Sequence, residues 1–272
     1  MASTAVRDLE TCQKMCEELR NQIRQIRNKT SNQILAELSA DVQVEHYNPQ
    51  KQKECTGHFG KIYALHWGPD SKNIVTASQD GKLIIWNSHS GNKQLAITLN
   101  SAWVMTCAFS PTYEYIASGG LDNTVSIFKT SNGANQDANQ GGSRFRSKDL
   151  YRELEKHDGY LSCARFIDNQ EIISASGDGT CILWDVEQRS AKNIFMDHTG
   201  DVMSIDLNKN DGKTFVSGSV DETAKVWDMR SSDRCVANFP GHESDINTVK
   251  WFVDSNSIVT GSDDGTVRLF DM

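Results

Sequence analysis

Histidine, serine or threonine, and aspartate recur together along this sequence, and these are the side-chain types of a hydrolytic catalytic triad. In a triad, a carboxylate orients an imidazole, which activates a hydroxyl for nucleophilic attack. The same groups can instead form a buried structural network, in which the hydroxyl accepts from a tryptophan N–H and every polar group is paired. The sets, each with its aromatic residue, are His58, Thr76, Asp80 and Trp86; His157, Ser174, Asp178 and Trp184; His198, Ser217, Asp221 and Trp227; and His242, Thr260, Asp264 and Phe270.

The regular recurrence of these sets favours the structural interpretation. Five aspartates, at positions 80, 122, 178, 221 and 264, are separated by 42, 56, 43 and 43 residues. Each follows a hydroxyl residue by four positions and precedes a large aromatic residue by six. The second repeat lacks the histidine and has Phe128 for tryptophan, and the fifth has Phe270, so we expect these two to be held less tightly. An active site is expected once in a chain, so we predict no catalytic residue and no enzyme activity.

Short alternating runs between these landmarks indicate the strands that must position them. Examples are KIYALHW, NIVTAS and KLIIWN, and they are separated by the turn signals SQDGK, SGDGT and SDDGT. A period in the low forties with Gly-His and Trp-Asp marks is typical of WD repeats, which form the four-stranded blades of a β-propeller. We therefore predict an all-β WD-repeat propeller over residues 46–272, with a surface loop at 131–147. The repeats are expected at about 50–88, 94–130, 148–187, 192–230 and 235–272.

The composition argues against several functional classes. A formal net charge of −8 leaves no basic patch for nucleic acid. Seven cysteines, an odd number without a CxxC pair, favour reduced thiols in a cytosolic protein. The sequence contains no P-loop, glycine-rich nucleotide loop or paired metal motif, so we expect no cofactor and no metal. The first residues lack the apolar run of a signal peptide, and no stretch approaches the length of a membrane span.

The first 45 residues do not belong to the repeat, and we predict that they form an α-helix followed by a short second helix at 32–39. Apolar residues spaced three and four apart form the a/d seam of a coiled coil. A narrow seam of this kind needs a partner helix more than it suits the surface of the chain's own propeller, although packing on that surface is the alternative. The seam residues are Leu9, Cys12, Cys16, Leu19, Ile23 and Ile26.

Several stretches of this sequence resemble the beta subunit of heterotrimeric G proteins. They include GKIYALHWGPDS (60–71), SQDGKLIIWNS (78–88), SAWVMTCAFSP (101–111), GGLDNTVSI (119–127), GYLSCARF (159–166), HTGDVMS (198–204), HESDIN (242–247) and TGSDDGTVRLFD (260–271), together with ELRNQIR (18–24) in the predicted helix. The resemblance runs over nearly the whole chain. It is therefore more specific than a resemblance to WD repeats in general.

The resemblance implies a binding function with identifiable residues. It implies that the narrow top of the propeller binds the GDP-bound alpha subunit, and that the same surface binds effectors once alpha leaves. The matching top positions are Lys61, Tyr63, Trp103, Met105, Leu121, Asn123, Tyr160, Asp201, Met203, Asp245, Asn247 and Asp263, and the matching positions on the side of the first blade are Lys82, Ile84 and Lys93. Turn or core roles are the alternative for Asp201, Asp245, Met105 and Leu121. A tryptophan at position 103 is not required by the repeat, which makes it the strongest functional candidate.

The resemblance also implies partners and a location. The helix implies an obligate gamma subunit, whose lipid anchor holds the complex at the cytoplasmic face of the plasma membrane. Membrane attachment of this chain then comes only from its partners. The alternative function is that of a generic WD-repeat scaffold or adaptor, which predicts no gamma-like partner and no role for Trp103.

The repeat count departs from the family. The resemblance implies seven blades, whereas this sequence contains five repeats, so we favour an incomplete sequence or a truncated isoform. Residues 50–56 are expected to form an outer strand that completes the last blade. With this strand, a ring of five blades is topologically possible. However, the side chains that pack neighbouring blades together suit a wider ring. An open arc would leave unpaired strand edges.

Overall fold

The computed structural model describes residues 14–15, 18–19, 21–22, 25, 48–99, 101–130, 144–145, 150–231 and 234–272. The chain divides into two compact units, Met1–Lys51 and Gln52–Met272. In the first unit, residues 14–15, 18–19, 21–22 and 25 are helical, and Leu19 of the predicted seam is exposed. The other seam residues and the predicted second helix lie outside the described residues. These seam residues are Leu9, Cys12, Cys16, Ile23 and Ile26.

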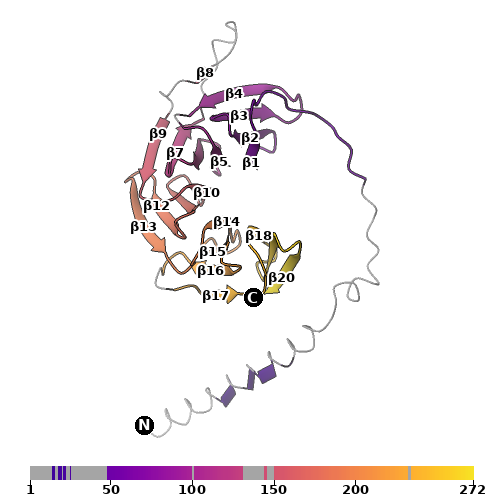
Figure 1. Cartoon of the computed structure of the whole chain (residues 1–272), viewed down its shortest axis with the longest axis vertical. Helices are drawn as coiled ribbons and strands as arrows, with labels where there is room; N and C mark the ends of the chain where they lie inside the picture. The colour runs from indigo at the N-terminus through magenta and orange to yellow at the C-terminus, as the bar shows by residue number, and fades with distance from the viewer. Residues whose placement is uncertain are drawn as a thin grey trace. The chain divides into compact units, whose positions relative to one another are not determined.

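All the regular secondary structure described in the second unit is β-strand, in five sheets that follow one another in an arc (Figure 1). The first two sheets comprise β1 (Ile62–Trp67), β2 (Asn73–Ser78), β3 (Lys82–Asn87) and β4 (Lys93–Thr98), then β5 (Val104–Phe109), β6 (Tyr115–Gly120), β7 (Thr124–Lys129) and β9 (Leu150–Glu155). The next two comprise β10 (Leu161–Phe166), β11 (Glu171–Ser176), β12 (Cys181–Asp185) and β13 (Ser190–Phe195), then β14 (Val202–Leu207), β15 (Thr214–Ser219), β16 (Ala224–Asp228) and β17 (Ala237–Phe239). The last comprises β18 (Ile246–Trp251), β19 (Ser257–Ser262) and β20 (Val267–Asp271).

This arrangement confirms the predicted all-β propeller architecture. In each blade, the strands pair in sequence order, and the innermost strands β1, β5, β10, β14 and β18 contact one another in succession around the arc. The predicted loop at 131–147 contributes β8 (Arg144–Phe145), which pairs in parallel with β4. The rest of that loop lies outside the described residues.

The turn between the second and third strands of each blade has a fixed geometry. Gly81, Gly179 and Gly265 follow the repeat's aspartate with positive φ angles of 74°, 80° and 77°. Glycine reaches this left-handed conformation without steric cost. Asn123 and Glu222 occupy the same place with φ of 58° and 68°, so the turn keeps its shape in the two repeats that lack the glycine.

The core lies between adjacent blades. One buried cluster joins Ala117 and Ile127 of the second blade to Ile172 and Trp184 of the third. Others join the first blade to the second, the third to the fourth and the fourth to the fifth. Each of the three middle blades therefore buries its two faces against two neighbours, as expected for stacked repeats.

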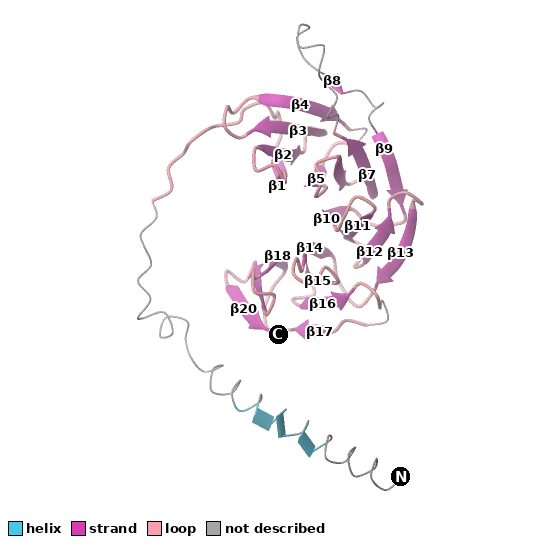
Figure 2. Ribbon diagram, turned by 180° about the vertical axis from the view of Figure 1, so that it is seen from behind, coloured by secondary structure: helices cyan, strands magenta, loops and turns pink. Residues whose placement is uncertain are grey.

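The two ends of the arc expose faces that are buried elsewhere. Leu269 and Val267 of β20 are 50% and 75% exposed, whereas the residues at the position of Leu269 in the other blades, Ile85, Ile127, Leu183 and Val226, are at most 5% exposed. At the other end, Leu65 pairs with the repeat's hydroxyl residue and is 61% exposed, whereas its equivalents Cys107, Ala164, Ile205 and Val249 are at most 1% exposed. Figure 2 shows the blades carrying these faces at opposite ends of the arc.

The prediction of an outer strand at 50–56 is wrong. Described residues 48–60 contain no strand, and the last sheet has three strands. Within the second unit, the residues before β1 contact the first blade, where the Glu54 carbonyl lies near Gly91 and His58 contacts Thr76. Because the segment is held by the blade that follows it, it supplies no edge to β20.

Candidate functional site

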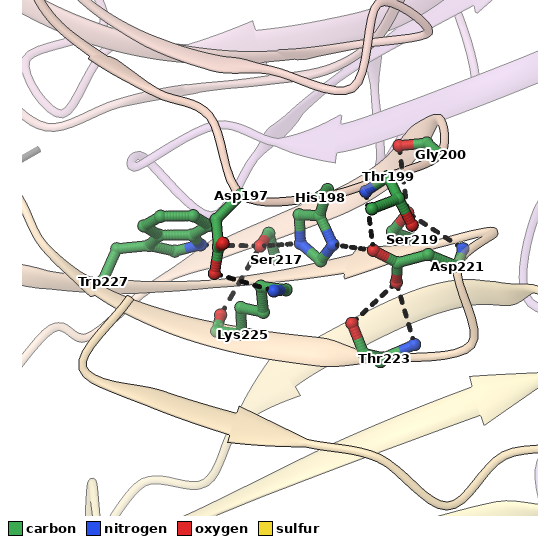
Figure 3. Close-up of polar contacts among 10 residues, drawn as sticks. All are labelled: Asp197, His198, Thr199, Gly200, Ser217, Ser219, Asp221, Thr223, Lys225 and Trp227. Atoms are coloured by element: carbon green, nitrogen blue, oxygen red, sulfur yellow. Dashed lines mark hydrogen bonds and ion pairs between the residues drawn. The ribbon is translucent and has the colours of Figure 1, made fainter. Parts of the chain in front are cut away.

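The fourth blade holds a continuous chain of hydrogen bonds from an aromatic residue to a carboxylate (Figure 3). Trp227 Nε1 donates to Ser217 Oγ at 2.7 Å. His198 Nε2 lies 2.7 Å from the same oxygen, and His198 Nδ1 lies 2.7 Å from Asp221 Oδ2. Because an ionised carboxylate only accepts, Nδ1 carries the proton and Nε2 is free to accept from the hydroxyl.

Asp221 also fastens the loop before the blade to the turn within it. Its carboxylate accepts from the backbone N–H of Thr199 at 3.1 Å, and from the N–H and hydroxyl of Thr223 at 3.0 and 2.6 Å. Burial alone would raise the pKa of Asp221, but hydrogen bonds from His198 and Thr223 hold it well below its ordinary value. The ionised carboxylate therefore organises two backbone segments.

The first, third and fifth blades repeat this arrangement. The Nδ1–carboxylate and Nε2–hydroxyl distances are 3.0 and 2.7 Å for His58, 2.8 and 2.8 Å for His157, and 2.6 and 2.7 Å for His242. Trp86 and Trp184 donate to the hydroxyl at 2.8 Å, whereas Phe270 cannot. The bonded hydroxyl residues are Thr76, Ser174 and Thr260, and the bonded carboxylates are Asp80, Asp178 and Asp264.

Burial explains why these sets hold structure and do not activate a nucleophile. The hydroxyl residues Ser174, Ser217 and Thr260 are fully buried. Burial also lowers the pKa of His157, although Asp178 acts in the opposite direction. A substrate carbonyl has no path to a hydroxyl enclosed in this way, and attack requires such an approach.

The networks and the predicted top residues lie at the same end of the sheets. Antiparallel pairing places the first residue of each innermost strand beside the last residue of the second strand, as in Ile62 with Ser78 and Val202 with Ser219. Loops before the innermost strands therefore meet the turns that carry the aspartates. In the four blades that have a histidine network, the geometry of that network thus fixes the loop at this end of the sheet.

Trp103 and Tyr63 form an aromatic pair across the first two blades. Their rings are stacked, with centroids 6.1 Å apart, and the two residues are 43% and 39% exposed. Trp103 has a φ of 64°, an unusual backbone conformation for tryptophan. A Cβ added to Gly120 would lie 2.0 Å from the Trp103 carbonyl oxygen. Glycine at position 120 therefore leaves room for the backbone that presents Trp103.

Tyr160 connects the third blade to the fourth on the same surface. Its hydroxyl donates to Asp201 Oδ2 at 2.9 Å and lies 3.4 Å from Met203 Sδ. Burial and the contact with Asp201 raise the pKa of Tyr160 to about 12. The tyrosine therefore stays protonated and orients one carboxylate oxygen of Asp201. Asp201 lies two residues after Thr199, whose backbone N–H donates to Asp221.

The fifth blade brings three predicted residues together. The Asn247 side-chain amide donates to the Asp263 carboxylate, and the Asp263 backbone N–H donates to the Asp245 carbonyl at 3.0 Å. Asn247 and Asp263 are exposed. This end of the surface is therefore polar and acidic, in contrast to the aromatic pair at the other end.

The remaining predicted residues divide between the surface and the interior. Lys61, Leu121 and Lys93 are exposed, and Met105, Asn123 and Lys82 are half-buried. Ile84 is fully buried, so its expected surface contact is wrong. It lies in the middle of the first sheet, paired with Thr76 and Ala96, beside the network of His58, and this position encloses its side chain.

Phe59 is an exposed residue that the sequence analysis did not single out. Its side chain is 89% exposed, and the Lys82 ammonium lies 5.5 Å from its ring centroid. Its backbone N–H donates to Asp80 at 2.9 Å. The sequence feature that could have predicted this exposure is the place of Phe59 directly after Gly57-His58. There the bond from its backbone N–H to Asp80 directs the side chain outward.

The described part of the chain offers no group of three or more histidine, cysteine, aspartate or glutamate side chains arranged to hold a metal ion. Within the same residues, no helix has both the length and the apolar character needed to cross a bilayer.

The fold and the repeated networks define a WD-repeat propeller. The family model of the G protein beta WD-40 repeat protein matches residues 6–272. The chain is 46% identical over 223 residues to the guanine nucleotide-binding protein subunit beta of Arabidopsis thaliana, a match that covers 79% of this chain and 57% of that protein. It is 44% identical over 236 residues to the subunits of Oryza sativa subsp. japonica and Zea mays, covering 83% of this chain and 60% of each.

The chain belongs to the G protein beta WD-40 repeat family, a non-catalytic signalling family. It spans about 57–60% of the length of these curated relatives.

Proposed function

We propose that this chain acts as a beta subunit in a heterotrimeric G protein. The top surface of the propeller binds the GDP-bound alpha subunit, and effectors use the same residues after nucleotide exchange on alpha removes it. The half-exposed aromatic pair of Trp103 and Tyr63 carries this proposal. A rigid, partly apolar pair surrounded by polar residues is the usual anchor of a protein interface.

The charge and polarity of the surface support one asymmetric partner. Lys61 lies near the aromatic pair in the first blade, whereas Asp201, Asp245 and Asp263 lie in the fourth and fifth blades. A partner with complementary charges would therefore dock in one orientation. Lys82 and Lys93, together with Phe59, extend the first-blade end of the surface onto the side of that blade.

The N-terminal helix supplies the second half of the proposal. It pairs with a gamma subunit through the predicted a/d seam, of which Leu19 is described and exposed. The side chain of Leu19 is 54% exposed, which leaves apolar surface for a partner helix to cover. The complex is held at the cytoplasmic face of the plasma membrane by the lipid anchors of its partners.

The test is a titration of the chain, co-expressed with a gamma subunit, against a GDP-bound alpha subunit. Trp103→Ala should weaken binding by roughly 30-fold, corresponding to about 2 kcal/mol for a hot-spot residue. Trp67→Ala is the matched control, because Trp67 is also half-exposed but lies at the opposite end of β1 from Tyr63. Circular dichroism checks that both variants keep the fold.

Equal affinity of the Trp103→Ala variant and the parent chain would refute the assignment of the top surface. Purification of the chain without any small helical partner would instead favour the generic scaffold.

A further inference from the structure

The loop that presents Trp103 lacks a hydrogen bond that fixes the corresponding loops of the other blades. In the four blades with a histidine network, the repeat's aspartate accepts from the backbone N–H of the residue after the histidine. These donors are Phe59, Asp158, Thr199 and Glu243, at 2.9, 3.0, 3.1 and 3.2 Å. Ser101 stands at this place in the second repeat, and within the described part of the chain its N–H makes no bond to Asp122. Other contacts must therefore hold the loop before β5.

The first blade supplies these contacts. The Trp103 backbone N–H donates to the Gln79 carbonyl at 3.3 Å, and the Leu99 backbone N–H donates to the Gly81 carbonyl at 2.9 Å. Gly81 also lies close against the loop, since a Cβ added to it would be 3.2 Å from the Ser101 carbonyl oxygen. Both ends of the loop are thus bonded to the turn between β2 and β3.

The histidine network of the first blade gives that turn its shape. Asp80 lies at the centre of the turn and accepts from the backbone N–H groups of Phe59 and Lys82, at 2.9 and 3.1 Å. His58 Nδ1 lies 3.0 Å from the same carboxylate, and His58 Nε2 lies 2.7 Å from Thr76 Oγ1. Burial alone would raise the pKa of Asp80, but hydrogen bonds from Phe59 and His58 hold it below its ordinary value. The ionised carboxylate therefore fixes the turn.

Gln79 links the two members of the aromatic pair through its backbone. Its N–H donates to the Lys61 carbonyl at 2.9 Å, two residues before Tyr63, and its carbonyl accepts from Trp103. The rings of Tyr63 and Trp103 then stack with their centroids 6.1 Å apart. The φ of 64° at Trp103 is a costly conformation that persists only where surrounding contacts hold it. Gln79 and Tyr63, both of the first blade, provide such contacts.

We propose that His58 is a positioning residue for the aromatic pair of Trp103 and Tyr63. Through Asp80 it fixes the turn that carries Gln79, and the Gln79 carbonyl fixes the backbone of Trp103 in the next blade. The network of one blade therefore controls the main binding residue of its neighbour. The consequence for binding rests on the proposed function, because it requires the alpha subunit to dock on this pair. The positioning itself involves contacts within this chain alone.

The first experiment follows the tryptophans of the 272-residue chain by fluorine NMR after labelling with 5-fluorotryptophan. Substitution of each tryptophan by phenylalanine assigns the six resonances. His58→Ala should move the resonance of Trp86, which shares its network, and also that of Trp103 in the next blade. His198→Ala is the matched control, because it removes the same ring from the fourth blade. It should move the resonance of Trp227 and leave that of Trp103 in place.

A second variant separates positioning from a general loss of structure. His58→Asn keeps a donor for Asp80 but loses the contact with Thr76, so it should move the Trp103 resonance less than His58→Ala does. Circular dichroism checks the fold of each variant, and His58→Asn carries the test if the alanine variant does not fold. An unshifted Trp103 resonance in the folded His58 variants, or an equal shift in His198→Ala, would overturn the proposal.

A double-mutant cycle measures the consequence for binding of the GDP-bound alpha subunit. His58→Ala should weaken the affinity by roughly 10-fold, because it displaces the aromatic anchor. In the Trp103→Ala background it should change the affinity by less than about 2-fold, since the residue through which it acts is gone. Equal weakening in both backgrounds would overturn the proposal. Failure of the proposed function gives a different result: Trp103→Ala would bind alpha as the parent chain does, while His58→Ala would still move the Trp103 resonance.

Discussion

The fourth and second blades share the spacing of the repeat but differ in the hydrogen bonds that the repeat's aspartate accepts. In the fourth blade, Asp221 accepts hydrogen bonds from His198, Thr199 and Thr223. In the second blade, Asp122 is exposed, and among the described residues its carboxylate accepts from the backbone N–H groups of Gly120 and Thr124 alone, at 3.2 and 3.5 Å. The same residue type at the same place thus binds the preceding loop in the fourth blade but not in the second.

This difference identifies the histidine as the member that completes the network. The fifth blade lacks the tryptophan, yet Asp264 and the Thr260 hydroxyl both remain bonded through His242. The second blade lacks both the imidazole and the indole, and there the hydroxyl of Ser118 has no partner. Loss of the indole N–H removes one hydrogen bond, whereas loss of the imidazole disconnects the hydroxyl from the carboxylate.

The largest expected effect comes from removing the carboxylate in each of these two blades. Asp221→Ala should lower the free energy of unfolding by about 3 kcal/mol, because His198 Nδ1 and two backbone N–H groups lose their acceptor. Asp122→Ala should change it by less than about 0.5 kcal/mol, as for an ordinary surface position. Urea denaturation of the parent chain and both variants measures the difference. Similar losses in the two variants would contradict the contrast between the blades.

The dependence of stability on pH should distinguish blades with a histidine from the blade without one. Burial lowers the pKa of His157 in the folded chain below the unfolded value of about 6.5. The unfolded state then binds more protons as the pH falls, so stability is fully present above pH 6.5 and declines below it. His157→Asn, which places in the third blade the side chain found at position 100, should flatten this slope. Unfolding free energies measured between pH 7.5 and pH 5 provide the test, and an equal slope in both proteins would refute it.

Part of this organisation could be predicted because it is local. The hydroxyl and the aspartate stand four residues apart at one end of a hairpin, and the aromatic residue follows on the next strand. The alternating runs predicted the all-β propeller, which the structure confirms. The spacing also showed that the second repeat lacks its histidine. Each of these inferences needed only the distances along one repeat.

Other features depend on contacts between repeats and were not accessible in the same way. Ile84 was placed on a surface, but its burial depends on the neighbouring strands and the loop of His58. The stacking of Tyr63 on Trp103 and the bond from Tyr160 to Asp201 each join two blades. A repeat period gives no information on these distances.

The smallest effect, and the one that separates the two blades most directly, concerns their serines. Ser217→Ala should cost about 1–2 kcal/mol, because it leaves Trp227 Nε1 and His198 Nε2 without their common partner. Ser118→Ala removes a buried hydroxyl that has no partner, so the free energy of unfolding should stay the same or rise by up to about 1 kcal/mol. Both substitutions delete one oxygen atom at equivalent positions, so differences in helix or strand propensity cancel. Urea denaturation under identical conditions compares them, and a destabilisation by Ser118→Ala as large as that by Ser217→Ala would show that the second blade satisfies its hydroxyl after all.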